Sequence, residues 1–320
     1  MHYRRLGRSG LKVSEISLGS WVTFGNQIDE STAISLIKEA FSQGINFFDN
    51  ADMYAGGQAE IVMGKAIADL PREELVISSK VFWPMSKGPN GRGLSRKHVT
   101  EAINASLKRL GTDYVDLYFC HRYDPDTPIE EVVRVMSDLV HQGKVLYWGT
   151  SEWESAQVMQ AFGTAREFGL IPPAMEQPQY NLFHRKRIED SLMPVARELG
   201  LGLTTFSPLY SGLLSGKYND GIPQGSRASM DDFSWVRDRI TPQRIEIVKQ
   251  LTEVARDLSI TTAQLAIAWV LRRKEVSTVI TGASRLEQLD ENLGASEAYE
   301  KLTEVDIDRI FACLGNYQEQ

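Results

Sequence analysis

The residues INFFDNADMYAGGQAE (45–60) decide the fold, because a short apolar run ends here directly on a carboxylate. Residues 45–48 read as a buried strand, Asp49 follows at once, and Tyr54 stands a little further along the chain. This pattern fits either a polar turn that leads into the next helix or one corner of an active site. The two interpretations differ in what the rest of the chain must supply, since only an active site needs partner residues elsewhere.

Eight apolar, β-branched or aromatic runs of this kind occur along the chain, and each predicts a short strand. They are EISLGS (15–20), INFFD (45–49), LVISSK (75–80), YVDLYFCH (114–121), KVLYWGTS (144–151), PAMEQ (173–177), LGLTTFS (201–207) and STVITGAS (277–284). Between them, apolar residues at three- and four-residue spacing predict amphipathic helices, for example over 30–44, 95–111 and 129–144. The predicted helix ends are Gly44, Gly111, Gly143 and Gly200, and the predicted starts are Ser95 and Thr241.

Regular alternation of strand and helix predicts an α/β protein with a parallel sheet. Eight such units favour a closed (β/α)8 TIM barrel. An open doubly wound sheet is the alternative, but the chain lacks G-x-G-x-x-G after its first strand, and GPNGRG (88–93) has the wrong spacing. We expect a β-hairpin before the barrel, turning at Ser9-Gly10, and one domain over residues 1–320. The longest irregular segment, 212–241, is expected to fold over a ligand as a lid.

The composition excludes several classes of protein. Of the 320 residues 42% are hydrophobic, and 42 acidic and 35 basic residues are mixed along the chain to give a net charge of −7. No Lys/Arg-rich stripe is present, so we expect no nucleic-acid partner. No apolar run approaches the ~20 residues that cross a bilayer, no signal peptide is recognisable, and two cysteines are too few for a disulfide framework. We therefore expect a cytoplasmic protein without membrane insertion.

Polar residues stand at the C-terminal ends of the predicted strands, where barrel enzymes build their active sites. Lys80, in VISSKVFW (76–83), is either a snorkelling surface lysine or a buried one that is paired with Asp49 of the adjacent strand. Such a pair beside Tyr54 would lower the phenol pKa from its reference near ~10 and let Tyr54 transfer a proton near neutrality. Asp52 gains no role from this pattern and is expected to be a loop or capping residue.

His121 follows the apolar run LYFC (117–120). A lone histidine at a strand end is more often structural, but this one shares a rim with Asp49 and Lys80, which favours a chemical role. A metal site formed by Asp49, His121 and Glu176 is the alternative. Barrel hydrolases usually begin with H-x-H on the first strand, and this strand reads SLGS (17–20), so we predict no metal.

The segment VITGASRLEQLDENL (279–293) enters the last predicted helix through S-x-x-E, a capping box at Ser284 and Glu287. It is either only a helix cap or, as the loop after the eighth strand, a phosphate site. Lys217 and Arg227 on the preceding long loop could supply positive charge to the same phosphate. Separately, Trp21, Trp83 and Trp153 lie on rim loops, where they either pack within the loops or form an apolar substrate wall.

With these residues in place, the chain resembles the aldo-keto reductases, and within them the branch that contains the potassium-channel β subunits. The resemblance covers essentially the whole chain. Its most specific pieces are LGSWVTFG (18–25), INFFDNADMYAGGQAE (45–60), GLSRKHV (93–99), YWGTSEW (147–153), FSPLYSGLLSGKY (206–218), SRASM (226–230) and GASRLEQLDENLGA (282–295).

The resemblance implies a catalytic tetrad of Asp49, Tyr54, Lys80 and His121 and an NADP(H) cofactor bound without a Rossmann domain. Ser151 and Gln177 would hold the nicotinamide carboxamide, and Phe206 would stack on its ring. The implied pyrophosphate path is Ser207, Leu209, Ser211, Gly212 and Lys217. The implied 2′-phosphate and adenine contacts are Arg227, Ser284, Gln288, Glu291 and Asn292, and Trp21 and Gly282 complete the implied cofactor site.

The expected function is therefore NADPH-dependent reduction of an aldehyde or ketone, with Tyr54 as general acid. The alternative is an NADP(H)-binding regulatory subunit that docks on a membrane channel and turns over slowly. The channel β subunits carry Asn at the position of His121, so this chain has the more usual enzyme set. Glu152 stands where that branch often has Arg. By resemblance we also expect a homo-oligomer, a tetramer.

Overall fold

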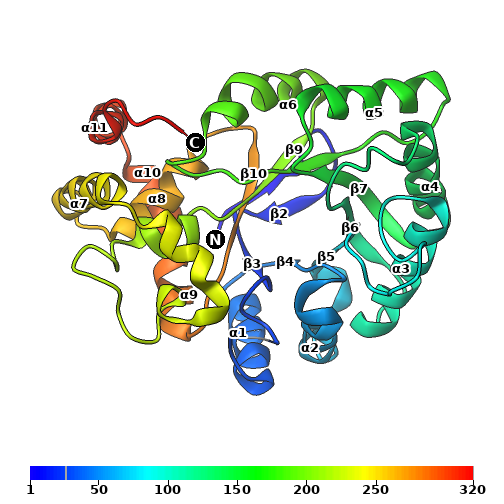
Figure 1. The fold of residues 1–320 in the computed structure, drawn as a ribbon, viewed down its shortest axis with the longest axis horizontal. Helices are drawn as coiled ribbons and strands as arrows, with labels where there is room; N and C mark the ends of the chain where they lie inside the picture. Colours follow the sequence, from blue (N-terminus) through cyan, green and yellow to red (C-terminus); the bar gives the residue numbers. More distant parts are fainter. Residues whose placement is uncertain (26, 320) are drawn as a thin grey trace.

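A closed barrel of eight parallel strands forms the centre of the computed structural model, which describes residues 1–25 and 27–319 (Figure 1). The strands are β3 (Ile16–Gly19), β4 (Phe47–Asp49), β5 (Val76–Val81), β6 (Val115–Cys120), β7 (Val145–Ser151), β8 (Met175–Gln177), β9 (Gly202–Phe206) and β10 (Val276–Thr281). They follow one another in chain order around the barrel, and β10 closes it by pairing with β3. The predicted (β/α)8 barrel is confirmed, although the last strand ends at Thr281 and does not reach Ser284.

Helices surround the barrel. The α-helices are α1 (Glu30–Ser42), α2 (Gln58–Ile67), α3 (Arg96–Leu110), α4 (Ile129–His141), α5 (Ser155–Glu167), α6 (Met193–Leu199), α7 (Pro242–Asp257), α8 (Thr262–Leu271), α9 (Leu286–Leu293), α10 (Ala295–Lys301) and α11 (Glu304–Leu314). Figure 1 shows α3 to α6 on one side of the molecule and α7, α8, α10 and α11 gathered on the other. Among the described residues, no helix combines the length and the apolarity needed to cross a membrane.

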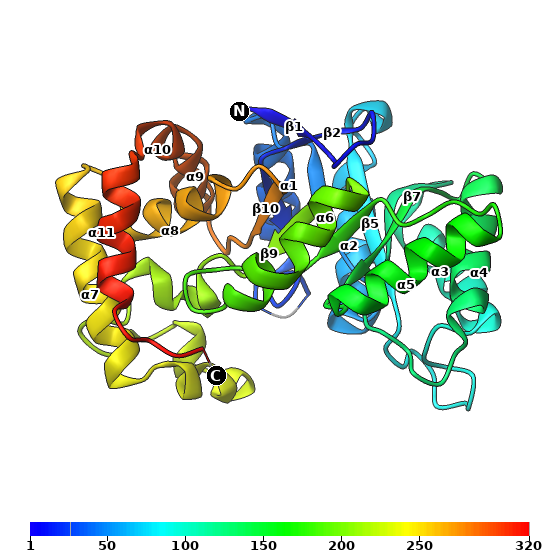
Figure 2. The same ribbon diagram turned by 90° about the horizontal axis from the view of Figure 1, so that it is seen from above.

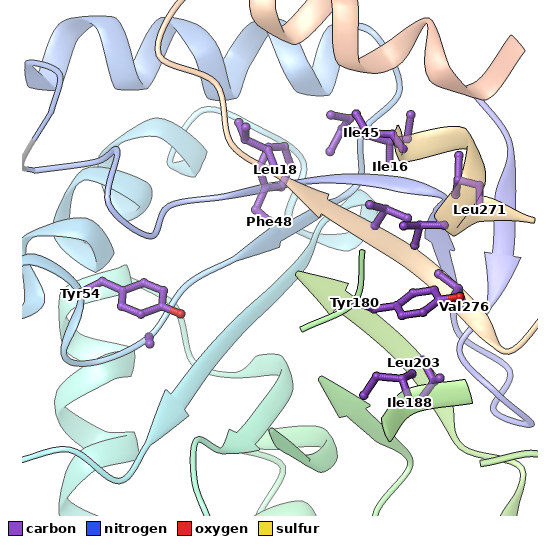
Figure 3. Packing of buried hydrophobic residues seen from close by; sticks show 14 of the residues in the cluster. Ile16, Leu18, Ile45, Phe48, Tyr54, Tyr180, Ile188, Leu203, Leu271 and Val276 are labelled. Carbon is purple, nitrogen blue, oxygen red and sulfur yellow. The ribbon is translucent and has the colours of Figure 1, made fainter. Parts of the chain in front are cut away.

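The barrel strands are buried on both faces, which is why they read as nearly continuous apolar runs. In β6, Leu117 and Phe119 belong to the cluster inside the barrel, whereas Tyr118 and Cys120 pack against the helices. Leu18 of β3 and Phe48 of β4 are register partners and lie against each other beneath the helices (Figure 3). The core therefore has a small inner part and a much larger part between barrel and helices.

The predicted hairpin is present as β1 (Tyr3–Arg5) and β2 (Lys12–Ser14), which pair antiparallel. Leu6 and Val13 from this hairpin belong to the inner cluster of the barrel, so the hairpin closes one end of it. Figure 2 shows the hairpin on one side of the molecule and the long loops that follow the strands on the opposite side. The C-terminal ends of the strands are thus the open end of the barrel.

Most predicted helix ends are confirmed. The Ser95 side chain accepts from the His98 N–H at the start of α3, and Thr241 accepts from the Arg244 N–H before Pro242 of α7. The predicted glycines follow their helices with positive φ: Gly44, Gly111, Gly143 and Gly200. The predicted capping box at Ser284 and Glu287 is wrong, because α9 begins at Leu286, and Ser284 instead contacts the side-chain oxygen of Gln288.

The segment 212–241 is less irregular than expected. It begins within the short helical turn η4 (Tyr210–Ser215) and contains two more, η5 (Arg227–Ser229) and η6 (Asp231–Arg239). Arg239 lies between the rings of Tyr210 and Trp235, 4.7 Å from each centroid, and donates to the Ser211 hydroxyl. These contacts hold η4 and η6 together at the open end of the barrel.

Candidate active site

Three adjacent strands bring the four predicted catalytic side chains together. Asp49 is the last residue of β4, Lys80 lies in β5, and His121 directly follows β6. Tyr54 opens the short turn η1 (Tyr54–Gly57) after β4. The rings of Tyr54 and His121 meet edge to face with centroids 5.8 Å apart. The residues that the sequence placed on one rim therefore lie side by side.

Lys80 is completely buried and holds this cluster together. Its ammonium donates to Asp49 Oδ2 at 2.7 Å, to the Asn50 carbonyl oxygen at 2.7 Å and to the Tyr54 hydroxyl oxygen at 3.2 Å. An ammonium has three N–H donors, so all of them have a partner. Because the Tyr54 oxygen accepts from Lys80, its own hydrogen is free to point elsewhere. The alternative of a snorkelling surface lysine is excluded.

Asp49 is fixed from both sides. Its Oδ1 accepts from the Ser78 hydroxyl at 2.8 Å and from Gln177 Nε2 at 3.0 Å, while Oδ2 faces Lys80. Ser78 was not predicted as a site residue. Its position two residues before Lys80 on the same strand was the available signal, because alternate residues of a strand share a face.

Burial raises the pKa of the Tyr54 phenol well above its ordinary value, and the Asp49 carboxylate adds to this effect. The predicted lowering of this pKa is therefore wrong for this arrangement, since a phenolate here would be an unhydrated anion close to a carboxylate. Burial also lowers the pKa of Lys80, against the opposing influence of Asp49. Tyr54 is consequently a protonated phenol at neutral pH.

His121 is a neutral imidazole at neutral pH. Burial lowers its pKa well below the ordinary value, and the charges of Lys80 and Arg122 act in the same direction. A neutral imidazole has one N–H donor and one acceptor nitrogen. Among the described residues, its buried Nδ1 has no hydrogen-bond partner. His121 can therefore offer a single hydrogen bond to an oxygen atom in the cavity.

The turn that carries Tyr54 is unusual in its backbone. Ala55, Gly56 and Gly57 all have positive φ, at 49°, 62° and 93°. A Cβ on Gly57 would lie 3.0 Å from Cδ of Arg109, so the turn passes closely over that side chain. Arg109 in turn donates to Glu60 of α2 at 2.6 Å. Helices α2 and α3 thus support the Tyr54 turn from behind.

Asp52 lies in the turn between β4 and η1, as predicted, but it is not exposed to solvent. It is fully buried, and within the described part of the chain neither carboxyl oxygen has a partner. Burial raises its pKa to about 8, and the nearby Glu60 contributes to the increase. Asp52 is therefore a neutral carboxylic acid behind the site at neutral pH.

A cavity of about 710 Å³ opens along the C-terminal ends of the strands, a size that suits a cofactor or other large ligand. Asp49, Tyr54 and His121 line it, whereas Lys80 lies behind them. All residues predicted to contact the cofactor also line it: Trp21, Ser151, Gln177, Phe206, Ser207, Leu209, Ser211, Gly212, Lys217, Arg227, Gly282, Ser284, Gln288, Glu291 and Asn292. Their individual contacts with a cofactor stay predictions.

One end of the cavity is strongly cationic. Partial desolvation of its ammonium group lowers the pKa of Lys217 to about 8, and the charges of Arg227 and Arg285 act in the same direction, although the residue as a whole is exposed. Arg227 is held by long hydrogen bonds to the uncharged side chains of Thr23 and Gln27. Arg227 is half-buried, and Lys217 and Arg285 are exposed. Three clustered cations on the cavity wall suit a ligand with several negative charges, such as the phosphates of NADP(H).

Aromatic side chains form part of the remaining wall. Trp21 and Trp83 line the cavity as predicted, and Trp21 stacks on Trp235 with centroids 6.2 Å apart. Trp153 does not contribute, which corrects the prediction. It is completely buried and packs edge to face against Tyr123 at 5.0 Å.

Several lining residues were not found from the sequence. The most informative are two cations, Arg122 and Arg285, each of which directly follows a predicted site residue. The turn 223–226 also lines the cavity, in line with the expectation that the segment 212–241 lies over a ligand, and its role as a lid stays a prediction. Arginines are common on protein surfaces, so the only signal for Arg122 and Arg285 was that each stands next to a predicted site residue.

Metal ligands are not grouped at this rim. Glu176, considered with Asp49 and His121 as a ligand set, accepts hydrogen bonds from the Thr150 hydroxyl and the Trp153 N–H and is buried. Within residues 1–25 and 27–319, no three His, Cys, Asp or Glu side chains are arranged to hold a metal ion.

Comparison with known proteins agrees with this geometry. The family model described as "Aldo/keto reductase family" matches residues 15–314. A "Probable voltage-gated potassium channel subunit beta" of Arabidopsis thaliana is 48% identical over 314 residues, which is 97% of this chain and 95% of the relative. A protein of the same description from Oryza sativa subsp. japonica is 46% identical over 318 residues, which is 98% of this chain and 97% of the relative. The chain belongs to the aldo/keto reductase family.

Proposed function

We propose that the protein is an oxidoreductase that uses NADPH to reduce aldehydes or ketones to alcohols. The observation that carries this proposal is the buried hydrogen-bonded chain from Asp49 through Lys80 to Tyr54, beside a cavity with a cationic end. Membership of the aldo/keto reductase family supports NADP-dependent oxidoreductase chemistry. A small carbonyl compound is the substrate in this proposal.

Tyr54 is the general acid. Its hydroxyl oxygen accepts from Lys80, so its hydrogen is available to a carbonyl oxygen in the cavity. As negative charge develops on that oxygen, Tyr54 donates its proton and an alcohol forms. The positive charge of Lys80, held by Asp49, stabilises the phenolate that remains until solvent returns a proton.

His121 orients the carbonyl group. Its neutral N–H donates a hydrogen bond to the carbonyl oxygen, on the side of the cavity next to the Tyr54 ring. Two donors on one oxygen polarise the carbonyl and stabilise the charge that develops there. An imidazolium would instead compete with Tyr54 as the proton donor, so the low pKa of His121 keeps the two roles separate.

NADPH, when bound, supplies the hydride that reduces the carbonyl carbon. Gln177 donates to Asp49 through Nε2, and no described residue donates to its Oε1, which leaves that oxygen for a carboxamide N–H. Lys217 and Arg227 line the cationic end of the cavity, and in this proposal they bind the phosphate groups. The other proposed contacts are Trp21, Ser151, Phe206, Ser207, Leu209, Ser211, Gly212, Gly282, Ser284, Gln288, Glu291 and Asn292.

A regulatory role is the second candidate, and the names of the two relatives favour it. In this case the protein would bind NADP(H), dock on a membrane channel and turn over slowly. A channel-docking subunit needs the cofactor cavity but not fast proton transfer at Tyr54. The two functions therefore differ in their dependence on this hydroxyl group.

Steady-state oxidation of NADPH with a panel of aldehydes separates the two candidates. For an enzyme, we expect rapid turnover that Tyr54→Phe reduces by about 10²-fold or more, while NADPH still binds. Binding is followed through the fluorescence of the reduced cofactor. Equal turnover by the wild type and Tyr54→Phe would refute the acid role, and slow turnover by both would favour the regulatory role.

We further infer that residues 1–320 act as one barrel domain, since the cavity takes its walls from segments between Gly19 and Asn292. A cytoplasmic location and a tetrameric assembly are also proposals. Sedimentation of the purified protein tests the assembly directly.

A further inference from the structure

Arg122 lines the cavity beside the four proposed catalytic side chains, and the proposed reaction gives its guanidinium no ligand. It directly follows His121 after β6, and its guanidinium lies 5.9 Å from the centroid of the Trp83 ring. One N–H donates to the carbonyl oxygen of His121. Since a guanidinium has five N–H donors, the others are available to a ligand.

The surrounding carboxylates have other partners. Asp124, two residues further on, accepts from the Leu94 N–H and the Thr127 hydroxyl, both at 2.7 Å. Asp49 faces Lys80. The Arg122 charge is close enough to oppose protonation of His121 and to favour ionisation of Tyr54. An arginine beside a reacting centre, without a carboxylate of its own among the described residues, is suited to bind an anion.

The phosphates of the cofactor do not account for Arg122. Lys217 follows β9 and Arg285 follows β10, whereas Arg122 follows β6. In the closed order β10-β3-β4-β5-β6-β7-β8-β9, β6 lies opposite β10 across the barrel. The cavity therefore has a second, separate positive charge at the end where the carbonyl group reacts.

We propose that Arg122 binds an anionic group of the substrate, so that the protein prefers short aldehydes that carry a carboxylate or a phosphate. The proposal rests on the carbonyl reduction proposed above. A guanidinium binds either anion through two parallel hydrogen bonds. With the anion on Arg122, the carbonyl group lies toward the adjacent Tyr54 and His121, and the ring of Trp83 covers the spacer between the two groups.

Matched pairs of aldehydes test this preference: succinic semialdehyde against butanal, 4-carboxybenzaldehyde against 4-methylbenzaldehyde, and glyceraldehyde 3-phosphate against glyceraldehyde. The readout is the ratio of kcat/KM for the charged member to kcat/KM for the neutral member. A charge-assisted hydrogen bond predicts a ratio of about 10 to 100 for the wild type. Arg122→Gln should bring this ratio close to about 1, whatever happens to the rate that both members share.

Arg96→Gln is the matched control, because Arg96 is exposed and paired with Asp138 between α3 and α4, outside the cavity. It should keep the wild-type ratio. A preference in only the carboxylate pairs or only the phosphate pair supports the proposal and identifies the anion. A wild-type ratio near unity in every pair, or a ratio that survives Arg122→Gln, overturns it.

A titration separates failure of this proposal from failure of the proposed function. If no aldehyde is reduced, the binding of 4-carboxybenzyl alcohol and 4-methylbenzyl alcohol is followed by tryptophan fluorescence, with and without NADP⁺. Tighter binding of the charged alcohol to the wild type, lost in Arg122→Gln, supports the anion site even without turnover. Equal binding of the two alcohols overturns it.

Discussion

The Lys80 ammonium lies 2.7 Å from the Asp49 carboxylate, and the two side chains are only 0% and 3% exposed. Taking two charges out of water costs several kcal/mol for each ion, and their attraction offsets this cost only while both are present. The other two N–H groups of the ammonium donate to the Asn50 carbonyl oxygen and the Tyr54 hydroxyl oxygen. The pair is therefore part of the stability of the fold as well as of the site.

Lys80→Met should lower the free energy of unfolding by about 3–5 kcal/mol, because it leaves Asp49 charged and buried without its partner. Urea unfolding measures the loss. The double variant with Asp49→Leu should recover part of it, since both charges are then absent. Lys65→Met is the control: Lys65 pairs with Glu30 at 2.8 Å, but both are about half exposed, so its loss should be about 0–1 kcal/mol. Similar losses at the two sites would contradict the prediction.

At saturating NADPH, where the titration of Lys217 does not limit cofactor binding, the rate of aldehyde reduction should be nearly constant between about pH 7 and pH 9. Ionisation of Asp52 in this range adds a negative charge that raises the pKa of Tyr54 further and keeps the phenol protonated. The acid must be protonated, and burial raises the pKa of Tyr54, so the active form persists into the alkaline range. His121 must be neutral, and burial lowers its pKa, so protonation reduces the rate only in acid. Profiles of kcat/KM against pH measure this. Samples held at pH 9 and assayed again at pH 7 control for unfolding, and a fall with an apparent pKa near 7 would contradict the assignment.

The eight strands could be predicted from the sequence because each is a short apolar run between turn residues, and both of its faces are buried. The grouping of the proposed catalytic residues could be predicted for a related reason. In a barrel, the C-terminal ends of all strands meet, so Asp49, Lys80 and His121 are brought together once the strands are assigned. The position of each residue at the end of its strand was sufficient to predict that the three side chains meet.

Features that depend on side-chain packing could not be predicted in this way. Trp153 and Trp83 both follow barrel strands, yet only Trp83 reaches the cavity, because Trp153 packs beneath the loop against Tyr123. The direction of the Tyr54 pKa shift depends on how deeply the ring is buried, which the sequence does not state. The burial of Asp52 could not be predicted for the same reason, since nothing in DNADMY (49–54) shows which carboxyl group faces inward.

Two buried carboxyls should make the folded state less stable as the pH rises. Burial raises the pKa of both Asp52 and Glu176 to about 8, from 3.8 and 4.5. Between these limits the folded state binds protons that the unfolded state has released, so the free energy of unfolding falls with rising pH. Each group contributes about 1.4 kcal/mol per pH unit across this window.

Asp52→Asn and Glu176→Gln should each reduce the loss of stability between about pH 5 and pH 8 by roughly 4 kcal/mol, which is the slope above taken over this range. Urea unfolding at several pH values measures the slope, and the double variant should show the smallest one. Glu73→Gln, which changes an exposed carboxylate, is the control and should keep the wild-type slope. A slope that is the same in all variants would mean that neither carboxyl is protonated in the folded protein at neutral pH.

Arg227→Ala should weaken the binding of NADPH much more than that of NADH, because only NADPH carries a 2′-phosphate on the adenosine ribose. Arg227 is half-buried, and its polar partners are the uncharged Thr23 and Gln27 at 3.3 and 3.4 Å, so its charge is available to a ligand. Loss of charge-assisted hydrogen bonds predicts a Kd about 10- to 100-fold higher for NADPH and changed by less than about 3-fold for NADH. Fluorescence titration with each cofactor measures both constants. Arg285→Ala tests the neighbouring cation in the same way. If Arg227→Ala weakened the binding of both cofactors equally, Arg227 would support the wall of the cavity and would not recognise the 2′-phosphate.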